Sequence, residues 1–552
     1  MRSIAKLMQD WQFTGPDGKT TLVELPHTWN AKDGQDGGND YWRGTCTYST
    51  TFAAPAFDAA SQEVWLQFEG VNSSAKVLLN GRNICTHDGG YSTFRVHVSD
   101  LLAKDNQLTV EVDNSINDRI YPQKADFTFY GGIYRDISLM VVSKNHIALG
   151  HFGDTGVKIT PALKDGRADI RVETIVEGEG AVSVELQDAA GSIVARAEGA
   201  DAQLHLDTPH LWDGVKDPYL YTCVVRLSSD GTVVDEVSTR VGLRTFSVDA
   251  KKGFFLNGRP YPLHGVSRHQ DRKGVGNAIT REMHDEDMAL IRELGANTVR
   301  LAHYQHDQYF YDLCDQYGMV VWAEIPYISE HLPNGRANTI SQMKELIYQN
   351  YNHPCIITWT PFNESWGVSK IETRQVEQHF TEAIYYLTKN FDTMRPVIVN
   401  DGWEHTVSDI ITLHDYEEVG EILYKRYTEY REKILTTEVY HSSAKSAFAN
   451  GYEYKGQPII ISEYGGIAFD NDDSGWGYGN KVNTKEDFIR RFDDITTAVK
   501  KIPYCCGFCY TQVSDVQQEI NGLMDMERNF KVEPEIIKEI NERQIGYWRS
   551  FM

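Results

Sequence analysis

The chain has 552 residues, which is long enough for three or four domains, or for two smaller domains and a barrel of about 250 residues. Hydrophobic residues (41%), charged residues (24%) and aromatic residues (11%) occur in proportions typical of a globular protein and exclude a disordered or fibrous chain. The formal charge of −24 disfavours binding to nucleic acid or to an anionic membrane, so neither is expected as a partner.

The sequence carries no sign of secretion, membrane insertion or a bound cofactor. Residues 1–10 lack a sustained apolar run, and no later stretch reaches the roughly 18 apolar residues of a membrane span, which predicts a soluble cytoplasmic protein. The eight cysteines are too sparse for a disulfide scaffold. Cys506 and Cys509 have the C-x-x-C spacing, but no second pair of ligands follows at zinc spacing, so no metal or redox site is expected there.

The part of the chain before residue 249 consists of short segments in which apolar and polar residues alternate, separated by turns. No helical pattern interrupts them, so they predict two β-sandwiches, a domain over residues 1–142 and an immunoglobulin-like domain over residues 143–248. The clearest strands are Glu63–Phe68, Ala75–Leu79 and Gln107–Val112 in the first domain, and Ala168–Thr174, Ala181–Leu186 and Tyr219–Leu227 in the second.

After about residue 253, short apolar runs alternate with amphipathic stretches of helical length, the pattern of parallel β/α units. Eight such runs predict a (β/α)8 TIM barrel over residues 249–552. An open doubly wound sheet is the alternative, but neither glycine-rich nucleotide-binding motif is present. The predicted strands are Tyr261–Val266, Asn297–Ala302, Met319–Ile325, Cys355–Phe362, Pro396–Asn400, Asp409–Leu413, Pro458–Glu463 and Cys505–Gln512, and the predicted helices include Arg281–Leu294, Asp307–Tyr317, Thr339–Tyr351, Thr373–Lys389 and Lys485–Lys500.

The active site of a TIM barrel lies at the carboxyl ends of its strands, and polar residues follow the apolar runs of this chain. Glu364 and Glu463 stand out because each ends a strongly apolar strand, where a carboxylate is costly unless it is used. Two carboxylates facing each other across the mouth are what retaining glycoside hydrolysis requires, one as acid/base and the other as nucleophile. The alternative for each is a salt bridge that stabilises the rim. The strand-end residues are Ser267–His269, Arg300–His303, Glu324, Asn363–Glu364, Asn400–Asp401, His414–Tyr416, Glu463–Tyr464, Tyr510 and Gln512.

A hydrolytic metal site is a second interpretation of the strand ends, since imidazoles and carboxylates also bind zinc. It would use His264, His269, His303, His306 and Glu324. The four residues between His264 and His269 place the two rings on different faces, however, and no tight ligand spacing is present. We therefore expect no metal, and histidines that bind sugar hydroxyls instead.

Short motifs in each of the three predicted domains occur together. They are Leu25–Trp29, Phe68–Asn72, Leu79–Gly81 and Tyr130–Asp136 in the first domain, Leu211–Trp212 and Pro218–Tyr221 in the second, and Leu263–His269, Val299–Tyr304, Asn363–Glu364 and Ser462–Gly465 in the barrel. In these motifs the chain resembles glycoside hydrolase family 2, the family of the bacterial β-galactosidases and β-glucuronidases, and most of all a short β-galactosidase. The resemblance covers nearly the whole chain and implies a sugar-binding jelly-roll β-sandwich, an immunoglobulin-like β-sandwich and a catalytic TIM barrel.

The resemblance also implies roles for individual residues. Glu364 would be the acid/base and Glu463 the nucleophile, in agreement with the choice made from the strand ends. Asn363 would bind the sugar 2-hydroxyl, a contact that strengthens in the transition state, and Tyr416 would hydrogen-bond the nucleophile. The other sugar contacts implied are Asp126, lent by the first domain, and His269 and His303 in the barrel.

The identity of the sugar depends on the segment Ile520–Arg528. It resembles the β-galactosidase segment whose asparagine, here Asn521, lies near the sugar C6 group. β-Glucuronidases carry an Asn-x-Lys motif there to bind the glucuronate carboxylate, whereas this chain has Glu519 and no lysine at the aligned positions. The triplet Asn529–Lys531 fits Asn-x-Lys, but it falls eight residues after the aligned lysine position and is interpreted as coincidental.

Two further residues complete the expected substrate contacts. Tyr510 ends the eighth strand, and Trp366 lies in the loop after the fourth, where anchoring of the loop is an equally good interpretation. The family's magnesium motif after the third strand is absent, so no magnesium is expected.

The leading hypothesis is an exo-acting, retaining β-galactosidase that acts on a small carbohydrate or glycoside. A β-glucuronidase, a β-galacturonidase, an arabinopyranosidase and a non-catalytic carbohydrate-binding protein are the alternatives, and homo-oligomerisation is left open.

Overall fold

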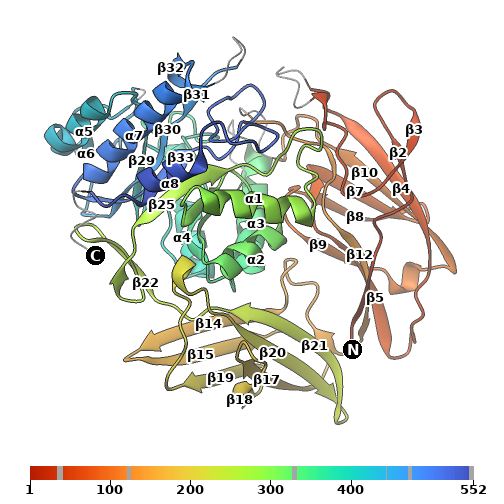
Figure 1. Cartoon of the computed structure of the whole chain (residues 1–552). Coiled ribbons are helices and arrows are strands. Elements are labelled where there is room, and N and C mark those ends of the chain that lie inside the picture. The colour runs from red at the N-terminus through yellow and green to blue at the C-terminus, as the bar shows by residue number, and fades with distance from the viewer. Residues whose placement is uncertain are drawn as a thin grey trace.

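The computed structural model describes residues 1–33, 41–120, 125, 127–325, 332–442, 444–469 and 475–545. These residues form two β-sandwiches and a TIM barrel domain, each with a hydrophobic core of its own (Figure 1). The first sandwich (red to orange) lies beside the barrel, and the second (yellow) lies below both in this view. The predicted fold class is therefore confirmed. The cores change near residues 142 and 248, where we propose the domain boundaries.

The first domain encloses its core between a four-stranded and a six-stranded sheet. Along β10 (Asp105–Asp113) the side chains of Leu108, Val110 and Val112 are buried and alternate with more exposed neighbours, as expected for a half-buried strand. Val110 lies between Tyr48 and Val77 of the two antiparallel neighbours. The first sheet has the order β1 (Ser3–Lys6), β12 (Ile137–Ser143), β5 (Gln62–Phe68) and β9 (Phe94–His97), and the second the order β3 (Thr20–Val23), β2 (Trp11–Thr14), β4 (Thr45–Ala53), β10 (Asp105–Asp113), β7 (Ser74–Leu79) and β8 (Arg82–Asp88).

The second domain is a smaller antiparallel sandwich. Val184 and Val225 face each other across β17 (Ala181–Gln187) and β20 (Tyr221–Ser229), and both are fully buried in its core. One buried side chain, Trp212, belongs instead to the barrel core and donates its indole N–H to the carbonyl of Asp315 at 2.8 Å, so the two domains are packed together. The sheets have the orders β14 (Val157–Lys164), β15 (Arg167–Thr174), β19 (Asp201–Leu206) and β18 (Ile193–Glu198), β17 (Ala181–Gln187), β20 (Tyr221–Ser229), β21 (Thr232–Val241).

The third domain is built on a curled parallel sheet whose strands are buried on both faces, as parallel strands covered by helices must be. Its strand order is β28 (Ile356–Thr360), β27 (Val320–Glu324), β26 (Thr298–Leu301), β25 (Leu263–Arg268), β33 (Cys505–Thr511), β30 (Ile459–Gly465) and β29 (Ile411–Asp415). These seven strands correspond to seven of the eight predicted ones, with shifted ends.

The predicted fifth strand, Pro396–Asn400, differs. The segment joins the sheet only through isolated bridges, at Val397 and at Asp401. The backbone N–H of Val397 donates to the Asp409 carboxylate at 2.9 Å, and Pro396 has no N–H to donate. Its apolar side chains fill the predicted place in the barrel wall, but the N–H groups of Val397 and Val399 donate to side chains, so the described part of the barrel contains seven regular strands.

Helices cover the outside of the barrel (Figure 1). The helix Gln308–Tyr317 begins and ends at capping residues. The side chain of Asp307 accepts a hydrogen bond from the N–H of Tyr309 at 2.8 Å, and Gly318 ends the same helix with a φ of +74°. None of the described helices is both long and apolar enough to cross a membrane. The helices are α1 (Arg281–Glu293), α2 (Gln308–Tyr317), α3 (Pro333–Asn350), α4 (Gln375–Phe391), α5 (Gly420–Glu429), α6 (Arg431–Leu435), α7 (Lys485–Lys501) and α8 (Pro534–Glu542).

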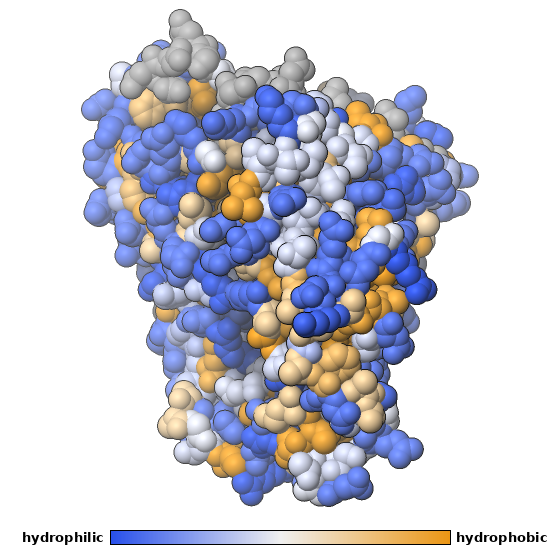
Figure 2. Space-filling view, turned by 90° about the vertical axis from the view of Figure 1, so that its right-hand side faces the viewer, coloured by the Kyte–Doolittle hydropathy of each residue, from blue (hydrophilic) through white to orange (hydrophobic). Residues whose placement is uncertain are grey.

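The surface is largely polar on one face of the molecule. On the face shown in Figure 2, hydrophilic residues predominate and hydrophobic ones lie in small patches between them.

An apolar contact is buried between the first domain and the barrel. It is an aromatic cluster that contains Tyr91, Phe127, Phe129 and Tyr134 of the first domain and Tyr304 of the barrel. This cluster brings the first domain against the carboxyl end of β26.

Candidate active site

Glu364 and Glu463 lie close together at the barrel mouth. Glu463 is part of β30, and Glu364 follows β28. The Tyr416 hydroxyl lies between them, 2.6 Å from Oε2 of Glu463 and 3.2 Å from Oε1 of Glu364. One oxygen of each carboxylate also lies within 4.8 Å of the other and of a nitrogen of His414. The structure thus brings together the two carboxylates that the sequence selected.

Glu463 is buried and is bound by two donors. Arg300 donates to its Oε1, and the Tyr416 hydroxyl donates to its Oε2. Burial raises the pKa of Glu463, but the positive charges of His414 and Arg300 outweigh burial and lower this pKa to about 2. Glu463 is therefore ionised at neutral pH, which is the state required of a carboxylate nucleophile.

Arg300 is the centre of a buried charge network at the end of β26. Its Nε lies 2.6 Å from Glu324 and 2.9 Å from Asp401, and its second amino group donates to Oδ1 of Asn363 at 2.6 Å. With the contact to Glu463, one guanidinium joins the ends of several strands. Burial raises the pKa of Glu324 to about 8 even though Arg300 opposes the shift.

Glu364 is more open than Glu463, with 18% of its side chain exposed against 8%. Its backbone has a φ of +52°, a conformation that non-glycine residues adopt only when their neighbours hold it. Here its N–H donates to the carbonyl of Asp401 at 2.8 Å, and the next N–H, that of Ser365, donates to Asn400 at 3.0 Å. The irregular fifth segment of the barrel therefore holds Glu364 in place.

His414 lies at the end of β29, is fully buried and contacts Glu364. Its Nδ1 lies 2.7 Å from Oε1 of Glu364, and its Nε2 lies 3.4 Å from Asp401 and 3.8 Å from Glu463. Burial lowers the pKa of His414, but Glu463 and Asp401 favour the charged ring more strongly and raise this pKa to about 10. Gly402 makes room for the ring, because a Cβ atom there would lie 2.6 Å from Nδ1.

The expected sugar-binding histidines lie next to this network. Nδ1 of His303 is 3.1 Å from Glu324, and the ring of His303 stacks on Phe127 of the first domain, with centroids 5.8 Å apart. Burial lowers the pKa of His303 to about 3 and that of His269 well below its usual range, so both rings are neutral. A neutral imidazole both donates and accepts, which suits hydroxyl groups. Asp126, the predicted contact from the first domain, lies outside the described residues.

Asn521 is fully buried in a set of side-chain amides and carboxylates. Its Nδ2 donates to Glu519 at 2.8 Å, and its Oδ1 accepts from Gln512 at 3.0 Å. The Tyr510 hydroxyl donates to the backbone carbonyl of Asn521 at 3.2 Å and accepts from the N–H of Ile467 at 3.1 Å. Tyr510 is buried, so in this structure its hydroxyl holds the Asn521 segment rather than facing an open pocket.

Lys531, the lysine of the Asn529–Lys531 triplet, is bound by protein acceptors. Its ammonium group donates to the Asp515 carboxylate at 2.7 Å and to the carbonyls of Phe469 and Ile520 at 2.9 Å each. A lysine has three N–H donors, so these three acceptors use all of them.

Trp366 is half-buried and packs on the aromatic cluster. This position anchors its loop and also lies near the barrel mouth.

Three clusters of described residues have ligand atoms close enough for a metal ion. They are Asp315 with His353 and Cys355, Glu63 with His146 and Glu177, and Glu364 with His414 and Glu463. In each cluster the imidazole already lies close to a carboxylate, at 2.6 Å from Asp315, 3.0 Å from Glu177 and 2.7 Å from Glu364. These are the distances of acid–imidazole pairs, and we assign no metal to them.

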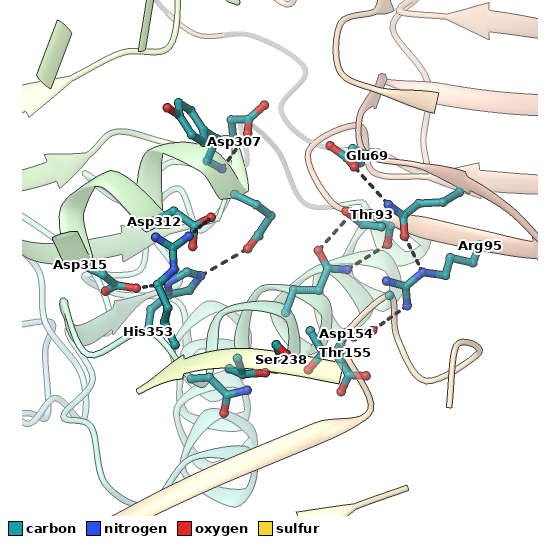
Figure 3. Close-up of a pocket in the computed structure, with 18 of the residues that line it drawn as sticks. Glu69, Thr93, Arg95, Asp154, Thr155, Ser238, Asp307, Asp312, Asp315 and His353 are labelled. Atoms are coloured by element: carbon teal, nitrogen blue, oxygen red, sulfur yellow. Dashed lines mark hydrogen bonds and ion pairs between the residues drawn. The ribbon is translucent and has the colours of Figure 1, made fainter. Parts of the chain in front are cut away.

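A cavity of about 520 Å³ lies at the junction of the three domains (Figure 3). The first domain contributes Glu69 and Arg95, the second Ser238, and the barrel Asp312 and His353. Of the described residues that line it, none belongs to the predicted site. Its polar side chains hydrogen-bond across the domain boundaries, so we interpret it as a seam between domains.

Family models match most of the chain. Residues 247–544 match the TIM barrel domain of glycosyl hydrolases family 2, residues 151–244 match a second family 2 model, and residues 35–173 match its galactose-binding domain-like model. The chain belongs to glycosyl hydrolase family 2. The barrel model covers the strands that carry Glu364 and Glu463, so the paired carboxylates lie in the family's barrel domain.

Similar proteins carry two different names. A β-glucuronidase of Bacteroides fragilis is 36% identical over 454 residues, which are 74% of this chain and 63% of that protein. Solved structures include an FMN-binding β-glucuronidase from Faecalibacterium prausnitzii L2-6, with 32% identity, and a putative β-galactosidase from Bacteroides fragilis, with 30%. Each of these two has a TM-score of 0.86 and covers 98% of this chain and 86% of its own. The chain thus spans less than two thirds of the B. fragilis β-glucuronidase.

Sequence reasoning placed Arg300, Asp401 and His414 at strand ends without selecting them. A signal was available for His414, because it lies two residues before Tyr416 and side chains two apart point to the same face of a strand. Arg300 and Asp401 could be selected only by knowing which charged residues they contact, and these residues lie on distant segments of the chain. The structure therefore adds Arg300, His414 and Asp401 to this candidate site.

Proposed function

We propose that the chain is an exo-acting, retaining β-glycosidase that hydrolyses terminal β-D-galactosides through a covalent intermediate at Glu463. The observation that carries the proposal is the short separation of Glu364 and Glu463, whose nearest oxygens lie within 4.8 Å of each other. Retaining glycosidases have carboxyl groups about 5 to 5.5 Å apart, whereas inverting enzymes need about 6.5 to 9.5 Å to admit a water.

The two steps follow from the surroundings of the carboxylates. In the first, ionised Glu463 attacks the anomeric carbon while Glu364 gives its proton to the glycosidic oxygen, the carbon–oxygen bond breaks and the alcohol leaves. In the second, Glu364 takes a proton from water, the water oxygen attacks the anomeric carbon, and the bond to Glu463 breaks. Arg300 and Tyr416 hold the nucleophile in position throughout.

Contacts with the sugar ring support the same reaction. Oδ1 of Asn363 accepts from Arg300, which orients the amide, and no described residue accepts a hydrogen bond from its Nδ2. We propose that this group binds the sugar 2-hydroxyl, where a hydrogen bond strengthens as positive charge develops at the anomeric carbon. His269 and His303 are proposed to bind further hydroxyls.

A neutral sugar is supported by the segment around Asn521. The Glu519 carboxylate lies next to Asn521, and Lys531 is bound by Asp515. A glucuronate carboxylate placed there would meet a negative charge without a cation to offset it, which costs about 2 to 5 kcal/mol in a desolvated site. A galactose hydroxymethyl group carries no such charge.

β-Glucuronidase is the second candidate, because the B. fragilis relative and one similar solved structure carry that name. Lys531 also lies 2.9 Å from the carbonyl of Ile520, the neighbour of Asn521, so a rearranged segment could present it to a carboxylate. The two candidates differ in one measurable property, the charge of the preferred sugar.

A panel of nitrophenyl glycosides tests the proposal, with β-galactoside, β-glucuronide, β-galacturonide and α-arabinopyranoside compared by kcat/KM. We expect the β-galactoside to be the best substrate and NMR of the first product to show the β-anomer. A preference for the β-glucuronide would select the second candidate. An α-anomer as first product would contradict the retaining mechanism, and binding without turnover on every substrate would contradict an enzymatic function.

A further inference from the structure

We propose that His414 is a positioning residue for the acid/base: it holds one oxygen of Glu364 and stabilises the negative charge that Glu364 gains when it gives up its proton. The inference rests on the proposed function and deepens it. Its basis is the direct contact between the two side chains, with Nδ1 of His414 2.7 Å from Oε1 of Glu364.

Glu364 has no other strong donor among its described neighbours. The Tyr416 hydroxyl has a single proton, and its contact with Glu463 is 2.6 Å, shorter than the 3.2 Å to Glu364. The shorter contact uses the proton, since a charge-assisted O–H···O⁻ bond is short. The N–H of His414 is then the donor for Oε1 of Glu364. This leaves Oε2 as the oxygen that exchanges a proton with the substrate.

His414 can supply a positive charge because of what surrounds it. The ring is fully buried, and the carboxylates of Asp401 and Glu463 lie 3.4 and 3.8 Å from its Nε2. Both favour the charged ring, in agreement with the raised pKa. The titratable and charged groups that act on it from the neighbouring elements are Glu364, Asp401, Glu463, Tyr416, Arg300, His303, His405 and His441.

This charge has a function in both steps. When Glu364 passes the proton on its Oε2 to the leaving oxygen, it becomes a carboxylate, and its hydrogen bond from His414 becomes a bond between charges. His414 keeps both of its protons, so the balance of the reaction is unchanged. In the second step Glu364 regains a proton from water. His414 therefore favours the state in which the leaving group has already been protonated.

The fold provides the space for this ring. The backbone N–H of His414 donates to the carbonyl of Gly402 at 3.1 Å, and a Cβ at Gly402 would clash with the imidazole. The ring of Trp403 also packs against the imidazole, with centroids 5.6 Å apart at 71°. The segment that holds the backbone of Glu364 thus also encloses its partner.

The test compares leaving groups, because an activated leaving group needs no acid. In His414→Leu, we expect kcat/KM to fall about 100-fold for an alkyl β-galactoside and by less than about 3-fold for the dinitrophenyl β-galactoside. His414→Asn restores a donor without the charge, and we expect an intermediate loss with the same dependence on the leaving group. The activity of this second variant keeps the test decisive if His414→Leu does not fold.

His405→Asn is the matched control. His405 is also a fully buried histidine next to β29, but its Nε2 lies 2.8 Å from the carbonyl of Thr412 and no contact joins it to Glu364 among the described residues. We expect this variant to change kcat/KM by the same factor for both substrates. Equal losses on both substrates in the His414 variants would overturn the inference and leave a structural role. Absence of hydrolysis by the unmodified protein would contradict the proposed function instead.

Discussion

The two carboxylates of the site are chemically identical, but their surroundings differ. Glu463 is buried under Arg300 and Tyr416, which bind both of its oxygens. Glu364 is more exposed, has strained backbone and is held on one oxygen by His414. One carboxylate is thus fixed as an anion, and the other has an oxygen that no described residue binds. In the proposed reaction, the environment rather than the residue type separates the nucleophile from the acid/base.

The sharpest test of this difference is Glu463→Gln. The amide cannot attack the anomeric carbon, so we expect kcat to fall by about 10⁴-fold or more on every substrate, whatever the leaving group. The side chains have nearly the same size, so the circular dichroism spectrum should match that of the unmodified protein. Substantial turnover in this variant would assign the nucleophile to another residue.

Glu364→Gln should behave differently. We expect kcat/KM to fall about 10² to 10⁴-fold for alkyl glycosides and much less for dinitrophenyl glycosides, because only the former need the proton. Azide needs no general base, so it should restore turnover of the activated substrate in this variant and not in Glu463→Gln. Rescue of both variants, or of neither, would remove the distinction between the two carboxylates.

Replacement of Arg300 tests whether the charge network around Glu463 is buried. Arg300→Met removes the guanidinium that contacts the buried Glu324, Asp401 and Glu463, and we expect the free energy of unfolding to fall by about 3 to 5 kcal/mol. Denaturation by urea measures the change. The control is Arg171→Met, which breaks an exposed pair with Asp201 and should change the free energy of unfolding far less, because water screens the pair. Similar losses in the two variants would argue against a buried charge network.

The sequence predicted the three-domain fold and the pair of carboxylates, because both depend on local patterns. Alternation with a period of two marks the sandwiches, and an apolar run that ends in Glu463 marks a strand end at the mouth. The fifth strand was predicted as regular because its apolar pattern does not show that Asp409 binds the N–H of Val397. Side-chain hydrogen bonds that compete with a sheet ladder are not visible in hydropathy.

The charge network could not be predicted in the same way. Arg300, Asp401 and His414 lie on three different segments of the chain, and their meeting depends on the closure of the barrel. Tyr510 was predicted to contact the substrate, and only the structure shows that its hydroxyl binds the backbone at Asn521. Pairwise contacts between distant segments, rather than element types, limit what one sequence predicts about a site.

The smallest expected effect concerns stability as a function of pH, which should distinguish the two sides of the site. The pKa of His414 is raised from 6.5 to about 10, so its charge stabilises the fold fully below about pH 6.5, and this contribution is lost as the pH rises toward 10. The pKa of Glu463 is lowered from 4.5 to about 2, so its contribution is present above about pH 4.5 and is lost as the pH falls toward 2. In His414→Asn the decrease in the apparent Tm between pH 7 and pH 10 should become shallower by a few degrees, as measured by scanning calorimetry. An unchanged slope would show that His414 is neutral in the folded protein. Glu364 would then lack the positive charge that the proposed role of His414 requires.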